Sequence, residues 1–234
     1  MQLIAYANIQ QPFPFEQIPL ELVPEKLRLP ATGNARVQQR HQCRRLAHFL
    51  LWQLLKTFVK NTALLPQIAR TASGRPYFPN QQMDFNISHS GDWVAVLLQT
   101  DSDSQSAVGI DIETGKTRNF GALMDYFAQP AEIAWFAQQQ DAQRAFYRCW
   151  CLREAVLKSQ GVGIVKLSEV EHRPQNLRIF SDYCPQGQLI FSAELPFYLA
   201  AFSNQIEPDW QIFYWHDQKL TPQNLLNPTI YQVN

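Results

Sequence analysis

Two segments with helical periodicity, each followed by short strand-like runs, most constrain how this chain can fold. The first covers residues 35–61, where large apolar residues recur at every fourth position and so share one helix face. The second covers residues 141–159, where Asp141 suits the N-cap and Gly161 the position just past the end. This order predicts an α+β fold of two similar halves.

Short strands are expected around these helices. The expected strands cover residues 3–7, 85–87, 93–98, 107–113, 165–171, 177–180, 189–194, 198–202 and 210–214. A further helix is expected from Pro130 to Phe136, because proline fits the first helical turn. The small polar run 101–105 predicts a loop that separates two halves, residues 1–105 and 106–234.

Composition excludes several classes of function. The formal net charge is zero over 234 residues, which disfavours nucleic acid or membrane partners, so an anion site must be a local cluster. The four cysteines fit no zinc spacing and indicate reduced thiols. The first residues lack the basic start and apolar core of a signal peptide, and no apolar run is long enough to span a membrane. We therefore expect a cytoplasmic protein.

The run Val108–Glu113 places two carboxylates on one face of an expected strand. Side chains alternate in a strand, so Gly109, Asp111 and Glu113 share the face opposite a core. Neighbouring carboxylates repel, and a hard cation such as Mg²⁺ would turn that cost into binding, with Gly109 leaving room beside the ion. The alternative is a solvated sheet edge with incidental charges.

The run Asn86–Trp93 is a polar corner between two apolar strands. Ser88, His89 and exposed backbone N–H groups are anion ligands. The alternative is a hairpin turn with a capped histidine. A Ser–His hydrolase is not favoured, because the chain has no nucleophile-elbow motif.

The second long helix carries a polar stripe. Trp150, Glu154 and Lys158 stand four residues apart and so share one face. The carboxylate could accept a proton or bind metal, and the ammonium could neutralise a phosphate. An ordinary helix-stabilising ion pair is the alternative.

Six cationic residues precede or open the first long helix. They are Lys26, Arg28, Arg36, Arg40, Arg44 and Arg45. Arginine forks suit phosphate groups, although a solvated helix face is the alternative.

The order and spacing of four motifs together resemble the 4′-phosphopantetheinyl transferases, and within them the monomeric, two-half surfactin-synthetase-activating branch. The motifs are Gly74-Arg75-Pro76, Phe85-Asn86-Ile87-Ser88-His89-Ser90-Gly91, Gly109-Ile110-Asp111-Ile112-Glu113 and Trp150-Cys151-Leu152-Arg153-Glu154-Ala155-Val156-Leu157-Lys158. The resemblance covers residues 36–165. It implies two similar α/β halves in a pseudo-twofold arrangement, with coenzyme A held in the cleft between them.

The resemblance also implies a metal site. Asp111 and Glu113 match the metal-binding acids of the family, and Glu132 resembles a third acid. The ion would be Mg²⁺, with Mn²⁺ as an alternative. Glu154 matches the acid near the metal and is a candidate base for the acceptor serine. Together with Asp111 and Lys158 it would form the catalytic set.

Further residues are implied in coenzyme A binding. Lys158 matches the lysine on the pyrophosphate, and Ser88 and His89 match the pair on the phosphate groups. Arg75 stands where lysine is common, with Pro76 beside it, and would lie near adenine or phosphate. Either Arg44 or Arg45 would contact the 3′-phosphate.

The implied activity is transfer of the 4′-phosphopantetheine arm of coenzyme A to a serine of an apo acyl or peptidyl carrier protein, with release of 3′,5′-ADP. Such holo-acyl-carrier-protein synthase activity would serve processes such as fatty acid biosynthesis. Residues 1–105 would bind the 3′-phosphate and adenine, and residues 106–234 would carry the metal acids, the catalytic helix and the docking surface. That surface would use Lys116 and Arg118 for charge, with Phe120, Leu123 and Met124 for apolar contact.

Two other functions fit the same residues. A metal-dependent hydrolase of a coenzyme A-like or nucleotide substrate would explain the acids and the basic cluster equally well. A non-catalytic module would bind coenzyme A without turnover. For the docking segment, the alternative is that its apolar residues belong to the core of the second half.

Overall fold

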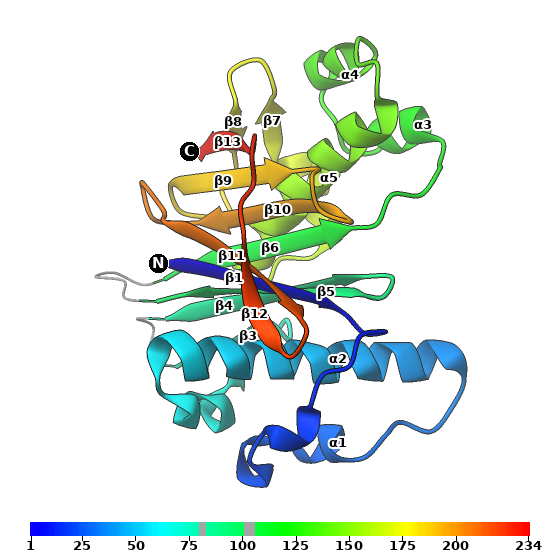
Figure 1. Ribbon diagram of the computed structural model, residues 1–234. Coiled ribbons are helices and arrows are strands. Elements are labelled where there is room, and N and C mark those ends of the chain that lie inside the picture. The colour runs from blue at the N-terminus through cyan, green and yellow to red at the C-terminus, as the bar shows by residue number, and fades with distance from the viewer. Residues whose placement is uncertain (80–82, 101–105) are drawn as a thin grey trace.

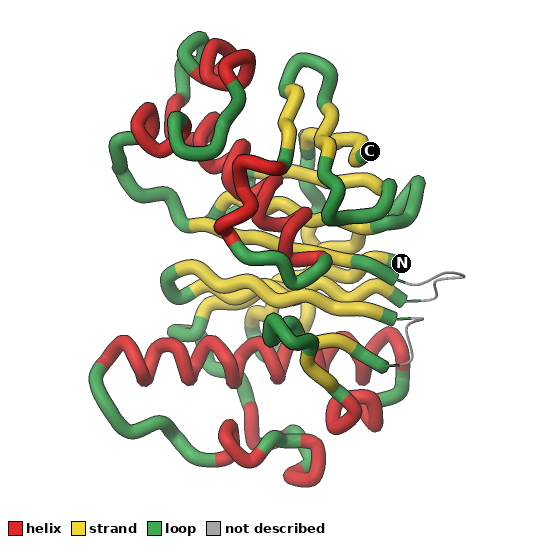
Figure 2. Tube along the Cα trace, turned by 180° about the vertical axis from the view of Figure 1, so that it is seen from behind, coloured by secondary structure: helices red, strands yellow, loops and turns green. Residues whose placement is uncertain are grey.

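The computed structural model describes residues 1–79, 83–100 and 106–234, and the protein is built in layers (Figure 1). A long helix, α2 (Ala35–Leu54), covers the outer side of one sheet, and a second, α5 (Ala142–Ser159), covers the outer side of another. Seen from behind, α5 crosses in front of the strands of the second sheet while α2 lies along the opposite end of the molecule (Figure 2).

The two halves repeat one topology. In the first, β1 (Gln2–Asn8), α2, β4 (Asp84–Ser90) and β5 (Trp93–Gln99) follow in sequence, and β5 lies antiparallel between β1 and β4. In the second, β6 (Val108–Glu113), α5, β9 (Gly187–Ser192) and β10 (Tyr198–Ser203) do the same, with β10 between β6 and β9. This repetition confirms the predicted α+β fold of two similar halves.

Further strands extend both sheets. The first sheet has the order β12-β11-β1-β5-β4, and the second has the order β6-β10-β9-β13-β8-β7. The added strands are β7 (Glu171–Arg173), β8 (Arg178–Phe180), β11 (Trp210–His216), β12 (Lys219–Gln223) and β13 (Thr229–Val233), and β2 (Ala69–Arg70) pairs separately with β3 (Pro76–Tyr77). The late strands β11 and β12 thus belong to the first sheet, through parallel pairing of β11 with β1.

Short helices fill the connections. They are η1 (Phe15–Gln17), η2 (Leu20–Leu22), α1 (Glu25–Arg28), η3 (Leu55–Val59), η4 (Thr62–Gln67), α3 (Phe120–Met124), α4 (Pro130–Phe136) and η5 (Ile164–Glu169). Figure 1 shows α3 and α4 together at the end of the molecule away from α2. Among the described residues, none of the helices combines the length and apolarity needed to cross a bilayer.

Three apolar cores hold the layers together. One lies between α2 and the first sheet, and one lies between α5 and the second sheet. The third joins the inward faces of both sheets, with Ile4 and Leu97 from one and Ile110 and Leu199 from the other. Because burial of apolar area is the main favourable term in folding, this third core binds the halves into one unit.

Most predicted elements are confirmed. The helix at 130–136 matches α4, and Asp141 caps α5, its carboxylate accepting the N–H of Arg144 at 2.9 Å. The strand predicted at 165–171 is wrong: Ile164–Glu169 forms a 3₁₀ helix, in which Leu167 is buried while Val165 is exposed. The strands β12 and β13 were not predicted, and the predicted loop at 101–105 lies outside the described residues.

Candidate active site

The facing edges of the two sheets are joined by side chains rather than by a backbone ladder. Alternate polar residues of β4 accept backbone N–H groups of β6 and the residue after it. The bonds run from Val108 to Asp84 (3.1 Å), Ile110 to Asn86 (3.1 Å), Ile112 to Ser88 (3.2 Å) and Thr114 to Ser90 (3.0 Å). An unpaired strand edge is thereby satisfied, and the polar corner predicted at 86–93 is brought beside the acids of 108–113.

Asp111 lies at the centre of this seam and is buried. Its Oδ1 accepts from Lys158 Nζ at 2.6 Å and from Ser88 Oγ at 3.1 Å. Its Oδ2 is buried with no hydrogen-bond partner among the described residues. A buried carboxylate oxygen without a partner is costly, and a bound cation would remove that cost.

Ser88 supports Asp111 and has no hydrogen-bonding capacity left over. It donates to the carboxylate and accepts from Lys158 Nζ at 3.1 Å and from the Ile112 N–H. The structure therefore brings Ser88 to the carboxylate that it orients. Ser90 does the same for the second acid, donating to Glu113 Oε2 at 2.7 Å.

Glu154 and Lys158 reach the seam from α5. The pKa of Glu154 is raised to about 7: burial is the main cause, Lys158 opposes it, and the charges of Asp111 and Glu113 add to it. Burial lowers the pKa of Lys158, but the carboxylates of Asp111 and Glu154 outweigh this and raise it overall. A carboxylate that changes charge near neutral pH is suited to proton transfer.

Gly109 allows α5 to lie directly on β6. A Cβ at this position would stand 1.9 Å from the carbonyl oxygen of Ala155 and 2.9 Å from the backbone nitrogen of Ser159. The space that the sequence suggested for an ion beside Gly109 is thus filled by the helix backbone. The close approach is what delivers Glu154 and Lys158 to Asp111.

A cavity of about 750 Å³ opens in the first half, next to the seam. Arg44 of α2, His89 of β4 and Pro76 of β3 are among its lining residues. Four lining side chains are Lys or Arg and two are Glu, so the cavity is net basic. The four cations are Lys26, Arg28, Arg44 and Arg70. Loss of solvent and the charges of nearby Lys158, Arg40 and Arg44 lower the pKa of His89, which favours its neutral form.

The neighbouring arginines Arg45 and Arg75 lie elsewhere. The guanidinium of Arg45 stacks over the ring of Phe15, 4.2 Å from its centroid. Arg75 pairs with Asp84 and donates to the backbone carbonyl oxygens of Lys158 at 3.0 Å and Val108 at 3.1 Å. Arg75 therefore links the two halves through hydrogen bonds, and it is not among the residues that line the cavity.

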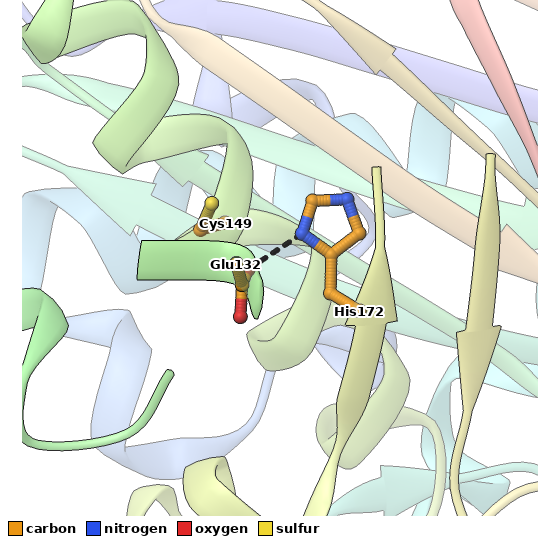
Figure 3. A group of neighbouring side chains, drawn as sticks. All are labelled: Glu132, Cys149 and His172. Atoms are coloured by element: carbon orange, nitrogen blue, oxygen red, sulfur yellow. Dashed lines mark hydrogen bonds and ion pairs between the residues drawn. The ribbon is translucent and has the colours of Figure 1, made fainter. Parts of the chain in front are cut away.

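Glu132, suggested as a third metal ligand, lies in a separate buried cluster (Figure 3). Both of its oxygens accept from Arg153, and Oε1 also lies 2.6 Å from His172 Nδ1. Charges of Asp111 and Glu113 act on Cys151, whereas Glu132 acts on Cys149. Residues two positions apart on a helix, such as Cys149 and Cys151, face roughly opposite directions. The cluster and Asp111 therefore lie on opposite sides of α5.

The oxygen, sulfur and nitrogen donors of Glu132, Cys149 and His172 lie within 4.8 Å of one another, as a metal site would require. A cation there would have to displace Arg153, and the second ring nitrogen of His172 lies 3.0 Å from the hydroxyl of Tyr231. Burial also raises the pKa of Cys149, which disfavours the thiolate that binds metal. This donor set fits a metal poorly. Asp111 differs, because its Oδ2 is a carboxylate oxygen that no group among the described residues occupies with a hydrogen bond, and such an oxygen is the kind of ligand that Mg²⁺ takes.

The buried cluster makes stability depend on acid pH. Burial opposes ionisation of Glu132, but hydrogen bonds from His172 and Arg153 prevail and lower its pKa from 4.5 to about 2. Because the folded-state pKa is depressed, this stabilisation is present above pH 4.5 and is lost as the pH falls toward 2. We expect the free energy of unfolding of Glu132→Gln to be about 3 kcal/mol below that of wild type at pH 6. At pH 3 this difference should be smaller by about 2 kcal/mol. Urea unfolding of both proteins at pH 6 and pH 3 measures this difference, and a difference that does not change with pH would contradict the prediction.

The sequence is similar to known 4′-phosphopantetheinyl transferases. A model of the 4′-phosphopantetheinyl transferase superfamily matches residues 107–215. A Haemophilus influenzae protein with a provisional 4′-phosphopantetheinyl transferase name is 61% identical over 231 residues, 99% of this chain and 98% of that protein.

Two further relatives match over shorter stretches. The 4′-phosphopantetheinyl transferase Sfp of Bacillus subtilis is 34% identical over 93 residues, 39% of each chain. The 4′-phosphopantetheinyl transferase AcpT of Salmonella typhimurium is 34% identical over 101 residues, 42% of this chain and 50% of that protein. The near-complete match to the Haemophilus protein, together with the superfamily match over β6 to β11, shows that this chain belongs to the 4′-phosphopantetheinyl transferase superfamily of enzymes.

Proposed function

We propose that this chain transfers the 4′-phosphopantetheine arm of coenzyme A to a serine of an apo acyl or peptidyl carrier protein. One arrangement carries the proposal: a basic cavity in residues 1–105 opens beside the carboxylates and lysine of residues 106–234. The first half would hold the adenine and 3′-phosphate, and the second would carry out the transfer. Since one chain supplies both parts, a monomer of the surfactin-synthetase-activating type suffices.

The residues have distinct roles in the proposed reaction. The serine oxygen attacks the β-phosphorus of coenzyme A, a new P–O bond forms, and the pyrophosphate bridge breaks so that 3′,5′-ADP leaves with the electron pair. Asp111 and Glu113 would hold Mg²⁺ or Mn²⁺, which when bound supplies positive charge next to the pyrophosphate oxygens. Lys158 neutralises charge on the leaving group, and positioning dominates, as in other phosphoryl transfers.

Glu154 is proposed as the base that takes the proton of the acceptor serine. Its pKa of about 7 leaves a large ionised fraction at neutral pH, and it lies beside Lys158 and Asp111. We expect Glu154→Gln, which cannot accept a proton, to lower kcat about 100-fold or more. Full turnover of this variant between pH 6 and 9 would exclude the role.

The position of the cavity supports Arg44, and not Arg45, as the proposed contact for the 3′-phosphate. Arg44 lines it, while Arg45 stacks on Phe15. We expect Arg44→Ala to raise KM for coenzyme A about tenfold or more, because a charged hydrogen bond is lost, and Arg45→Ala to leave KM near wild type. Dephospho-coenzyme A, which lacks the 3′-phosphate, is the control: the Arg44 effect should vanish with it. Equal KM changes in the two variants would contradict the assignment.

The carrier would dock on residues 116–127, next to the seam. Lys116 and Arg118 are exposed there, and Phe120 and Leu123 are half-buried. Met124 is fully buried in the core under α5, so its suggested part in docking is replaced by a part in packing. The proposed surface therefore uses cationic groups and the rim of an apolar cluster, which suits an acidic partner.

The direct test is intact-protein mass spectrometry of an apo acyl carrier protein after incubation with this chain, coenzyme A and Mg²⁺. A mass gain of one phosphopantetheine arm, absent with Asp111→Ala, is the expected result. Release of phosphate-containing product without a carrier would instead indicate a hydrolase. Coenzyme A binding without turnover on several acyl and peptidyl carriers would indicate a binding module.

A further inference from the structure

A buried chain of hydrogen bonds lies on the side of α5 opposite the active site and takes no part in the proposed chemistry. It joins the consecutive helices α4 and α5 to two strands that come later in the chain, β7 and β13. Its members are Glu132 of α4, Arg148 and Arg153 of α5, His172 of β7 and Tyr231 of β13. The side chains of Glu132, Arg153 and His172 are wholly excluded from solvent, and Tyr231 is buried as well.

The chemistry of the groups gives the chain one direction. Glu132 only accepts, so His172 Nδ1 carries the proton that it donates over 2.6 Å. His172 Nε2 then accepts from the Tyr231 hydroxyl at 3.0 Å, and Arg148 Nε donates to the same hydroxyl. Arg153 closes the other end on Glu132. Every participating group has a partner, and loss of solvent lowers the pKa of His172, consistent with a neutral ring.

Both ends of this chain of hydrogen bonds are side chains of α5. Arg148 and Arg153 are five residues apart, which spans about 7.5 Å of helix. Arg153 also donates to the carbonyl oxygens of Leu167 at 3.2 Å and Cys149 at 3.1 Å, so it ties α5 to the segment that follows. The helix is thus held at two points against rotation about its axis.

Small rotations of α5 matter for the active site. A rotation of about 10° would move a side-chain end some 5 Å from the axis by about 1 Å. Misplacement of that size can cost a reaction about 100-fold in rate. Glu154, directly after Arg153, and Lys158 both project from α5 toward Asp111.

We propose that His172 and Tyr231 are positioning residues of the transferase site, which fix the rotation of α5 through Glu132, Arg153 and Arg148. The inference rests on the proposed function. It assigns a part in catalysis to strand β7, at the far edge of the second sheet from β6, and to β13, in the interior of that sheet. The residues that line the basic cavity lie between positions 21 and 89, outside α5. Substitutions of His172 and Tyr231 should therefore lower turnover much more than they weaken coenzyme A binding.

The test compares Tyr231→Phe and His172→Phe with wild type and with Tyr183→Phe, which removes an exposed hydroxyl bonded to Glu169. We expect kcat to fall about tenfold in Tyr231→Phe and more in His172→Phe, with KM for coenzyme A within about twofold. His172→Asn, whose amide can replace the donor at Nδ1, should recover part of kcat. Assays are run well below each melting temperature on protein whose fold is checked by circular dichroism.

A purely structural role would lower the melting temperature and leave kcat of the folded enzyme unchanged, and that result for Tyr231→Phe would overturn the inference. If His172→Phe does not fold, Tyr231→Phe, which keeps the aromatic ring, is the variant that decides the inference. Hydrogen exchange of residues 149–158 gives a reading that needs no carrier protein. If residues 149–158 exchange at least tenfold faster in the variants than in wild type while exchange in α2 is unchanged, the inference is supported. Unchanged exchange at residues 149–158 opposes it. If wild type modifies no carrier, the proposed function fails and this exchange alone decides the inference.

Discussion

Replacing Asp111 with asparagine is expected to reduce carrier modification about 100- to 1,000-fold, because charge stabilisation by a metal site is worth several kcal/mol in a transition state. The amide keeps the shape of the carboxylate, so the contact with Ser88 can persist. The substitution removes the negative charge that pairs with Lys158. It also removes the anionic oxygen Oδ2, which has no hydrogen-bond partner in the part of the chain that the structure describes.

Two measurements distinguish a loss of catalysis in Asp111→Asn from unfolding of the variant. Asp111→Asn should bind coenzyme A in the absence of metal about as well as wild type, because the basic cavity lies in the other half. It should also need a higher Mg²⁺ concentration for half-maximal rate. Asp182→Asn, which alters an exposed carboxylate, is the matched control and should match wild type. Wild-type turnover and Mg²⁺ dependence in Asp111→Asn would remove Asp111 from the catalytic set.

Gly109→Ala is expected to destabilise the protein by about 3 kcal/mol or more, because overpacking at a backbone contact forces elements apart. The new methyl group would stand 1.9 Å from the Ala155 carbonyl oxygen, a backbone atom that cannot move away as a flexible side chain can. For a chain of this length the loss corresponds to a fall of roughly 10 °C in melting temperature. Activity of the remaining folded protein should fall as well, because α5 would be lifted off β6.

Gly163→Ala is the matched control for this change. A Cβ there would meet nothing within 4 Å, and the residue has φ −83°, which alanine adopts readily. We expect its stability to stay within about 0.5 kcal/mol of wild type, as for other surface substitutions. Calorimetry of the two variants checks the contrast. Equal melting temperatures would show that α5 does not approach β6 as closely as the structure has it.

The two changes act on one seam in different ways. Asp111 supplies chemistry, whereas Gly109 supplies the contact that brings α5 within reach of that chemistry. Both stand on β6, two residues apart and on one face, so the strand alternation that the sequence displays already placed them together. The structure adds that this face is covered by α5.

Local patterns of the sequence predicted the elements that carry the site. Four-residue apolar spacing located α2, Pro130 located the start of α4, and Asp141 located the cap of α5. Such signals depend on neighbours within a few residues, and so they survive without knowledge of the fold. The strand prediction at 165–171 was wrong because branched apolar residues favour strands, and nothing local shows that Val165 would face solvent.

The partners of charged groups were decided only by the tertiary structure. Arg44 and Arg45 are adjacent and alike in sequence, yet one lines the basic cavity and the other stacks on Phe15, because neighbours on a helix point about 100° apart. Arg75 is engaged by a carbonyl 83 residues away, and His172 reaches a hydroxyl 59 residues away. No local pattern encodes contacts at such separations.

By itself, the sequence determined most of the elements around the site, which carboxylates share the face of β6, and which family the motifs resemble. The tertiary structure alone decided that Glu132 is buried against Arg153 and His172, that Gly109 admits a helix, and that β11 and β12 join the first sheet. The physical reason is range. Periodicity and capping act between residues a few positions apart, whereas burial and ion pairing depend on which distant surfaces meet when the chain folds.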